Sequence, residues 1–591
     1  MRTRAAVALL FAAVPLAAQA PTTGVLGPRN TIRGEVGGSA ELYGITGREG
    51  RRPGQSARVF FSPTVTFGKL SISANFLLTT EGSSTLGLGG LPGRQRINQF
   101  GVSPQWGWGT AYLGSFSETY SPLTWSGVRV DGVGLDLTPG ILRIGLFGGT
   151  SRQPVFGGAT SGSFRRSMQG ARLGVGRRPS FGIGGTYLDV VLIRASDDPA
   201  SLPPLDPATE VPFLPDSQAV EPDTLLLPRV PINPYAVTPQ ENAVLATSGG
   251  VSLFGGAVSW SGEAAGSIHS RDQRAALVAD DVLRGYPGIL RGLVTPRAGT
   301  HVDYAYKSQV DVRIARLPGA TSRSPRSLTA SVAWQSIGAG YVSLGTGFLP
   351  NDLRGVDLRT ALRFRRWSVS VDASRLRDNL LDQKLATTFR SREGFTLTAQ
   401  PIRSWHASIR ATRVGMDRDL ADSLGAIAYS ARVINTSHAW IPGGKHRVRS
   451  VTASYTYQNI GDPSPLRAGS TLRSHGGDVR VSLALGGNAS ISPTLGLVRS
   501  RTADSAAGTR ATYGLAGEWR SLAQRWVTTA SVSRTQVSRT NALSARISSR
   551  YRITPEDTVI LELRANRYRS LVQQDLDFDE RAFNLRWSRR L

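Results

Sequence analysis

Apolar and polar residues alternate along most of the chain from Thr31 onward, in segments of about ten residues. Residues 356–364 place Val, Leu, Thr, Leu and Phe on one face and Asp, Arg, Ala and Arg on the other. Residues 405–412, 478–483 and 559–564 show the same separation, with charge opposite the aliphatic side chains. A period of two is typical of β-strands whose two faces meet different surroundings. The pattern therefore predicts an all-β fold.

The connections between these strands are predicted to alternate in length, with one longer loop between each two short turns. The short turns lie at 68–69, 104–107, 138–140, 177–180, 255–256, 365–366, 401–403, 442–444, 486–488, 521–525 and 554–557, with a further connection at 318–325. Short periplasmic turns and long extracellular loops are typical of antiparallel up-and-down transmembrane barrels. With a first strand near 31–45 and a last near 581–591, the turns predict a single barrel of about 26 strands, within a range of about 22 to 26.

The tryptophans provide an independent indication of a membrane interface. Most of the 11 lie within a few residues of a short turn or of the C-terminus: Trp106, Trp108, Trp367, Trp405, Trp440, Trp519, Trp526 and Trp587. An aromatic ring with one polar edge suits the boundary between lipid and water. A soluble β protein would instead scatter its tryptophans through the core, so the distribution favours a membrane barrel.

The last segment resembles the C-terminal assembly signal of Gram-negative outer-membrane β-barrels. Phe583, Leu585, Trp587 and Leu591 share one face, although Arg589 stands where an apolar residue is usual. Together with the strand pattern, the chain resembles a large, porin-like outer-membrane barrel. This resemblance implies a place in the cell outer membrane and three partners: the lipid bilayer, lipopolysaccharide and the barrel assembly machinery.

The N-terminus reads as a cleavable export signal over residues 1–20. Arg2 and Arg4 precede an apolar run, and residues 18–20 read Ala-Gln-Ala, a small-x-small cleavage site. Residues 21–30 then form a short periplasmic segment, which is too short to hold a globular plug. The barrel is predicted to occupy residues 31–591.

The chain carries a strong positive charge, with 69 Lys and Arg against 42 Asp and Glu and a formal net charge of +27. Export argues against nucleic acid as the partner. On the polar strand faces, the predicted anion-binding lumen residues are Arg359, Arg363, Arg410, Arg480, Arg564 and Arg586. Arginine is costly in hydrocarbon but suits a wet lumen, where it binds carboxylate and phosphate. The excess of arginine is equally compatible with a genomic bias, and the wall arginines with structural pairs across the lumen.

Two long loops stand out, at 195–240 and 271–296; the second contains a stretch that could form a short helix. The first holds eleven prolines and seven acidic residues, and proline at that density opposes regular structure. Because a wide lumen needs filling and opposite charges attract, loop 195–240 is predicted to fold inward as a gate. Its carboxylates that would face wall arginines are Asp206, Glu210, Asp216, Glu221 and Asp223. A disordered external loop explains the composition nearly as well.

Other chemistry has weaker support in the sequence. Asp575, Asp577 and Asp579 alternate and could gather oxygen ligands for a metal ion, but an arginine partner is the better interpretation. Ser267, His269 and Ser343 are candidates for an outer-membrane hydrolase, although nothing in their spacing requires one. No G-x-S-x-G, H-E-x-x-H or paired C-x-x-C motif occurs, which removes the commonest hydrolase and zinc signatures. The chain is therefore predicted to bind no cofactor and not to be an enzyme.

The leading functional hypothesis is a porin-like or transport channel for anionic solutes, with a loop as gate. The first alternative is a non-conducting surface or assembly barrel that binds a partner through its long loops. The second is the hydrolase.

Overall fold

A computed structural model describes most of the chain. The described residues are 30–50, 52–80, 98–155, 162–178, 185–202, 237–277, 292–314, 326–418, 420, 426–444, 446–462, 464, 470–503, 505–521, 523–537, 539–570 and 572–591. The predicted signal peptide and residues 21–29 lie outside them.

The first half of the barrel contains fourteen labelled strands. They are β1 (Asn30–Thr46), β2 (Gln55–Phe67), β3 (Leu70–Thr79), β4 (Gln99–Trp106), β5 (Gly109–Phe116), β6 (Thr119–Ser121), β7 (Trp125–Ser126), β8 (Val130–Leu137), β9 (Leu142–Arg152), β10 (Arg165–Gly176), β11 (Thr186–Asp198), β12 (Glu241–Leu253), β13 (Val258–Ser270) and β14 (Thr300–Ile314). Two short 3₁₀ turns, Pro199–Ser201 and Phe254–Gly256, follow β11 and β12.

The second half continues the same meander. Its strands are β15 (Ser327–Ile337), β16 (Leu353–Arg363), β17 (Trp367–Arg377), β18 (Thr388–Ile402), β19 (Trp405–Arg418), β20 (Ile427–Trp440), β21 (Val448–Gly461), β22 (Leu472–Ala484), β23 (Ala489–Thr502), β24 (Ser505–Ser521), β25 (Trp526–Val537), β26 (Thr540–Arg552), β27 (Asp557–Ser570) and β28 (Phe578–Arg590). A 3₁₀ turn, Gln574–Leu576, precedes β28.

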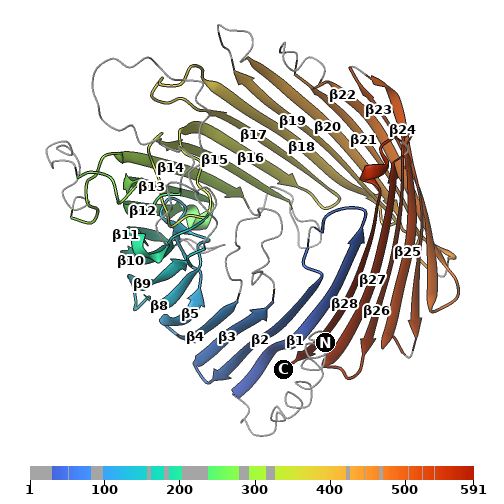
Figure 1. Cartoon of the computed structure of the whole chain (residues 1–591), viewed down its shortest axis with the longest axis horizontal. Coiled ribbons are helices and arrows are strands. Elements are labelled where there is room, and N and C mark those ends of the chain that lie inside the picture. The colour runs from blue at the N-terminus through green and yellow to red at the C-terminus, as the bar shows by residue number, and fades with distance from the viewer. Residues whose placement is uncertain are drawn as a thin grey trace.

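All strands except β6 and β7 form one antiparallel sheet of 26 strands. The sheet closes because β1 pairs with β2 on one side and with β28 on the other, from Glu35 opposite Arg590 to Thr46 opposite Asp579. Figure 1 shows this ring, in which the blue β1 lies beside the dark red β28. Closure leaves no sheet edge, so every strand can satisfy its backbone in lipid. The predicted fold and strand number are confirmed.

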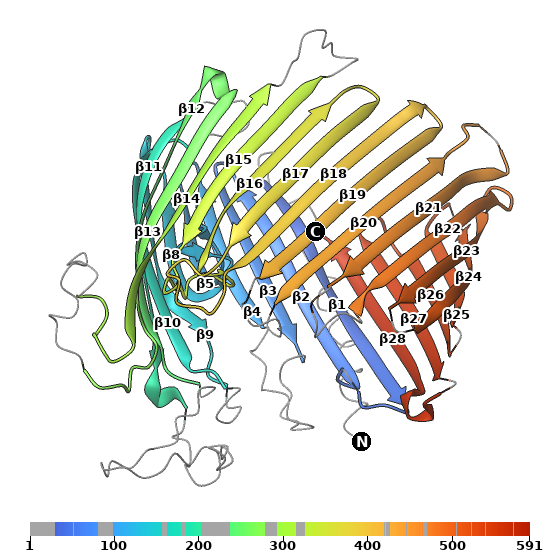
Figure 2. The ribbon, with the colours of Figure 1, turned by 90° about the horizontal axis from the view of Figure 1, so that it is seen from above.

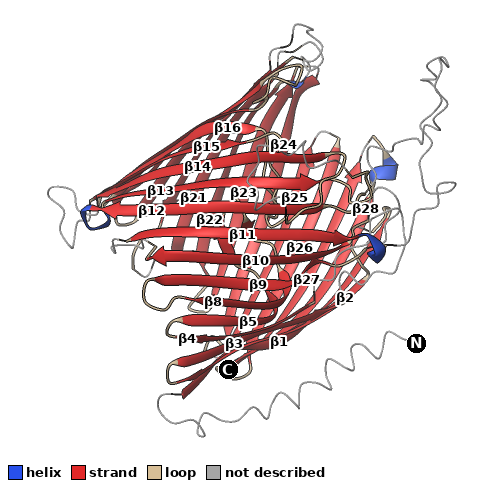
Figure 3. Ribbon diagram, turned by 90° about the vertical axis from the view of Figure 1, so that its left-hand side faces the viewer, coloured by secondary structure: helices blue, strands red, loops and turns tan. Residues whose placement is uncertain are grey.

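The two faces of the wall differ as the alternation predicts. Val479, Leu495 and Leu497 are each close to half exposed although they are large and apolar, which identifies their side as the outer, lipid-facing surface. The residues between them point into the lumen. Figure 2 shows the strands tilted across the wall, and Figure 3 shows how little structure other than strand the chain contains. Among the described residues, no helix has the length and apolarity that a membrane-crossing helix needs.

Three predicted boundaries need correction. β23 and β24 are joined by two residues, 503–504, and β25 and β26 by 538–539, so a long loop does not follow every short turn. The predicted loop 195–240 begins only at Pro199, because β11 runs to Asp198. The carboxylate of Asp197 accepts two hydrogen bonds from Arg166 of β10, at 2.7 and 2.9 Å, and thereby extends the ladder.

Candidate functional site: the lumen

The connection between β5 and β8 folds into the barrel as a small hairpin. This lumen hairpin, residues 117–129, contains β6 and β7 as its own two-stranded sheet. Trp125 at its tip is fully buried and stacks on Phe147 of β9, with ring centroids 3.9 Å apart. Tyr120 meets the same two rings edge-on. The hairpin therefore packs on the inner wall with an aromatic core of its own.

Glycines on the inner wall make room for these rings. A Cβ atom added at Gly134 would lie 2.9 Å from the Phe116 ring, and one at Gly145 would lie 2.5 Å from the Tyr120 hydroxyl. At Gly170 it would lie 2.5 Å from Ile193. Real Cβ atoms do not approach so closely, so a side chain at Gly145 would displace Tyr120 of the hairpin, and side chains at Gly134 and Gly170 would displace the wall residues around the hairpin.

The connection between β15 and β16, residues 338–352, holds the lumen hairpin in place; we call it the locking loop. The Tyr341 hydroxyl donates to the Leu123 carbonyl at 2.8 Å, and the Ser343 hydroxyl donates to the Thr124 carbonyl at 2.6 Å. The backbone amide of Ser126 donates to the Gly345 carbonyl at 3.0 Å. Two loops that are distant in sequence thus form one unit inside the lumen.

The locking loop is itself bound to the wall and to a neighbouring loop. The Asn242 amide of β12 donates to the Val342 carbonyl at 2.9 Å and accepts from the Leu344 amide at 3.0 Å. At its far end, Asp352 pairs with Lys384 of the next long loop.

The ionisation of this pair reflects the contact. Burial raises the pKa of Asp352, but hydrogen bonds from Lys384 and from the amides of Leu380 and Asn379 lower it more, so it lies below its usual range. The hydrogen bond to Asp352 raises the pKa of Lys384.

Charges near the lumen hairpin are neutralised within the protein. Asp189 of β11 is fully buried and lies 3.2 Å from Arg143 and 2.9 Å from Arg178. Arg172 contacts Asp136 at 2.6 Å and lies over the Tyr120 ring. Glu263 of β13 accepts hydrogen bonds from the Ser121 hydroxyl and the Leu123 amide. None of these residues was predicted from sequence, because their roles depend on a loop that folds back onto the wall.

The predicted lumen arginines all face inward, but they are not equivalent. Arg564 pairs with Glu562 at 2.9 Å, and Arg586 pairs with Glu35 at 3.3 Å. The other four make no ion pair within the described residues; these luminal arginines are Arg359, Arg363, Arg410 and Arg480. They lie on β16, β19 and β22.

Arg359 also lines a recess of about 640 Å³ in the inner wall. Asp311 and Asp372 share this recess with polar side chains of β14, β15 and β17. Free guanidinium groups beside a hydrated recess are suited to binding carboxylate or phosphate. Unlike the arginines under the lumen hairpin, the four luminal arginines make no ion pair in the described structure, although Asp311 and Asp372 contribute negative charge to the same recess.

The remaining predicted sites have different outcomes. The gate residues Asp206, Glu210, Asp216, Glu221 and Asp223 lie outside the described residues, so the inward gate stays a prediction. The helix suggested after Asp272 is not formed over 271–277, which are turns and an isolated bridge from Leu277 to Arg297.

The candidate metal ligands near the last loop are occupied by arginines. Asp577 and Asp579 pair with Arg569, at 3.8 and 2.9 Å, and Asp579 also pairs with Arg567 at 3.2 Å. Within the described part of the chain, no three His, Cys, Asp or Glu side chains, Asp575 included, form a group that could hold a metal ion.

The candidate hydrolase residues do lie in one region of the lumen, but they have structural partners. The Ser267 hydroxyl donates to the Val342 carbonyl, and that of Ser343 donates to Thr124. His269 is buried on the same face of β13, and its Nε2 atom has no hydrogen-bond partner in the described structure. The two hydroxyls therefore secure the loops, and neither is bonded to the imidazole as a nucleophile would be.

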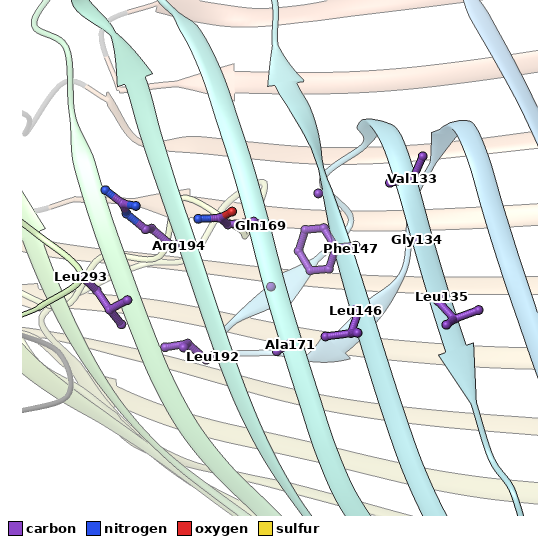
Figure 4. A pocket seen from close by; sticks show the side chains of 12 residues that line it. Val133, Gly134, Leu135, Leu146, Phe147, Gln169, Ala171, Leu192, Arg194 and Leu293 are labelled. Carbon is purple, nitrogen blue, oxygen red and sulfur yellow. The ribbon is translucent and has the colours of Figure 1, made fainter.

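A crevice of about 510 Å³ lies on the outer face, over β8 to β11. Figure 4 shows its apolar lining, with Gln169 and Arg194 at one end and Leu293 of the second long loop beside them. Arg194 is neutralised by Glu241 at 2.9 Å. This crevice faces lipid and is separate from the lumen.

Comparison with known proteins gives the fold and little else. No protein-family model matches the chain. No curated protein sequence matches it either.

Solved structures match over most of the length. The P pilus usher (PapC) translocation pore matches with 10% identity and a TM-score of 0.35, covering 95% of this chain and 99% of the usher chain. The siderophore receptor PirA from Pseudomonas aeruginosa matches with 10% identity and a TM-score of 0.41, covering 96% and 81%. OccK5 (OpdH) from Pseudomonas aeruginosa matches with 11% identity and a TM-score of 0.26, covering 60% and 93%. Likenesses at this level support no particular function. The closed ladder and apolar outer face are those of a transmembrane β-barrel.

Proposed function

We propose that this barrel is an outer-membrane channel for small anionic solutes, with an aperture narrowed by the lumen hairpin and the locking loop. The observation that carries the proposal is the contrast between the two sides of the lumen. Under the lumen hairpin the wall arginines are paired with buried carboxylates, whereas the four luminal arginines make no ion pair in the described structure.

Guanidinium groups without an ion-pair partner on a lumen wall favour ions of opposite sign, because the protein screens charge less than bulk water does. The four guanidinium groups would therefore attract chloride, carboxylates or phosphates into the lumen. Four arginines on three strands also give a passing anion several weak positions, which conduction needs more than one tight site.

The orientation follows from the same barrel. Strand β1 begins and β28 ends at the short-turn end, which we assign to the periplasm because short turns face that compartment in bacterial barrels. The loops that fold inward then enter from the outside of the cell.

Single-channel recording in planar bilayers tests the proposal. In a KCl gradient the parent barrel should show discrete conductance steps and a reversal potential on the anion-selective side. Replacing all four luminal arginines with Gln should move the reversal potential toward cation selectivity while steps persist. A barrel that inserts but never conducts would instead support the hypothesis of a surface barrel that binds a partner.

A further inference from the structure

Directly opposed arginines on neighbouring strands occur on both faces of the barrel wall. On the inner face, Arg546 of β26 lies opposite Arg564 of β27. Like charges directly opposite one another destabilise a sheet. Here Glu562 offsets the repulsion, because its carboxylate lies 2.9 Å from both guanidinium groups.

Among the described residues, the outer face carries three such pairs. One is Arg354 of β16 opposite Arg377 of β17, and the other two lie in a single row. Arg413 of β19 lies opposite Arg432 of β20, and Arg473 of β22 lies opposite Arg501 of β23. Asn459 of β21 connects the two pairs, since it lies opposite both Arg432 and Arg473. We call these four arginines the outer arginine row. Neighbouring strands are about 4.8 Å apart, so the row spans five strands in about 20 Å.

This row has almost no counter-charge from the protein. Arg413 lies 3.9 Å from Glu393, a long contact between two exposed side chains. Arg432, Arg473 and Arg501 are exposed and make no ion pair within the described residues. The arrangement that Glu562 neutralises on the inner face is therefore left positive on the outer face.

The row lies at the boundary of the lipid-facing band. One step toward the short turns, the same outer face carries Ala411, Ile434 and Tyr457 on β19 to β21 and His475 and Arg499 on β22 and β23. The next step carries Ile409, Tyr455 and Leu497. In the opposite direction the strands end within a few residues, at the long-loop end of the barrel. Arginine is costly in hydrocarbon and favourable beside headgroups. The row is thus positioned where lipid headgroups begin.

We propose that the outer arginine row binds the phosphate groups of a phosphorylated lipid in the leaflet at the long-loop end. Each opposed pair can share one phosphate oxygen cluster, as Arg546 and Arg564 share Glu562. Planar guanidinium groups bind phosphate through paired hydrogen bonds. The apolar side chains below the row would contact the acyl chains of the same lipid. The proposal does not depend on the channel function, because these side chains face away from the lumen.

The probe is labelled diphosphoryl lipid A in detergent. It is titrated into the purified full-length barrel, and binding is measured from the change in its fluorescence. The test variant combines Arg413→Gln, Arg432→Gln, Arg473→Gln and Arg501→Gln. The control combines the same substitution at the four luminal arginines, so both variants lose the same charge. Since each basic side chain near a headgroup contributes to lipid binding, the outer variant should bind at least about tenfold more weakly. The luminal variant should bind as the parent does.

Three results would contradict the proposal. Equal weakening in both variants would mean that net charge alone attracts the lipid. Unchanged binding in the outer variant would place the lipid elsewhere. Displacement of lipid A by inorganic phosphate at equal concentration would show a phosphate site without lipid preference. Reversal potentials of the same two variants give the opposite pattern, so failure here and failure of the channel proposal are distinguishable.

Discussion

Replacing Trp125 with Ala should release the lumen hairpin from the wall and widen the pore. The Trp125 ring is fully buried, stacks on Phe147 and meets Phe116 and Tyr120 edge-on. Its indole Nε1 donates to the Val128 carbonyl at 2.9 Å, which closes the hairpin on itself. The substitution therefore removes both the anchor of the hairpin and part of its internal structure.

The size of the effect follows from this burial. Truncating a buried tryptophan to alanine costs about 3–5 kcal/mol. The barrel ladder does not include Trp125, because β6 and β7 form a separate sheet. The loss should consequently weaken the docking of the hairpin and leave the barrel closed. A loss of about 3 kcal/mol changes a docking equilibrium by about a hundredfold.

Single-channel recording measures the outcome. We expect Trp125→Ala to give a larger mean conductance and more open-channel noise than the parent. Trp334→Ala is the matched control, since Trp334 is 41% exposed on the outer face. Both variants should keep the heat-modifiable gel migration of a closed barrel. Parent-like conductance and noise in Trp125→Ala, with the barrel intact, would refute the idea that the hairpin sets the aperture.

Three further predictions follow from the same structure. Gly145→Val should increase conductance as Trp125→Ala does, because its side chain would displace the Tyr120 hydroxyl, whereas Gly148→Val should not, since a Cβ at Gly148 meets nothing within 4 Å; conductance of the pair is the measurement. The pKa of Asp352 is lowered, so its ionised carboxylate stabilises the locking loop. This stabilisation should be present above the ordinary pKa of 3.8 and be lost as pH falls below it. Channel noise should then rise in acid, and Asp352→Asn should be noisy already at neutral pH. Arg473→Gln removes the repulsion between Arg473 and Arg501, so it should increase the free energy of unfolding by about 0.2–1 kcal/mol in lipid-free, uncharged detergent. Calorimetry should then show a higher melting temperature, and a lower one would contradict this.

The fold could be predicted because the two faces of a barrel wall impose a regular pattern of apolar and polar residues on each strand. Each strand must show lipid one face and water the other, so a period of two survives along residues 356–364 and every similar segment. The number of strands in the closed barrel then follows from the number of turns. The count remained correct where two loops proved short, because a two-residue turn at 503–504 still reverses the chain. What failed there was the expectation of a longer loop between each two short turns, because β24 begins at Ser505, directly after this turn, and runs for 17 residues.

The lumen hairpin could not be predicted in the same way. Residues 117–129 read as an ordinary loop, and nothing in their own sequence says that they fold inward. A signal was nevertheless present in the aromatic residues Tyr120 and Trp125, which lie far from any short turn. Glycines at alternate positions of the next strands, such as Gly132 and Gly134, mark the inner surface that receives them. To connect the aromatic residues with these glycines, one must know which strands face the loop across the lumen. Only the structure of the closed barrel shows this.

The order of elements along the chain divides the lumen into two parts with separate tasks. Strands β8 to β13 combine inward glycines with buried ion pairs, so they can hold a loop closely while presenting little net charge to a solute. In the part of the chain that the structure describes, strands β16 to β22 hold no such loop, and the four luminal arginines on them make no ion pair. Packing on one side sets how wide the channel is, while charge on the other side sets which ions enter. Changes to the lumen hairpin should therefore alter conductance with little effect on reversal potential, and changes to the luminal arginines should do the reverse. Variants that alter both quantities together from either side would show that aperture and selectivity are set by one shared constriction instead.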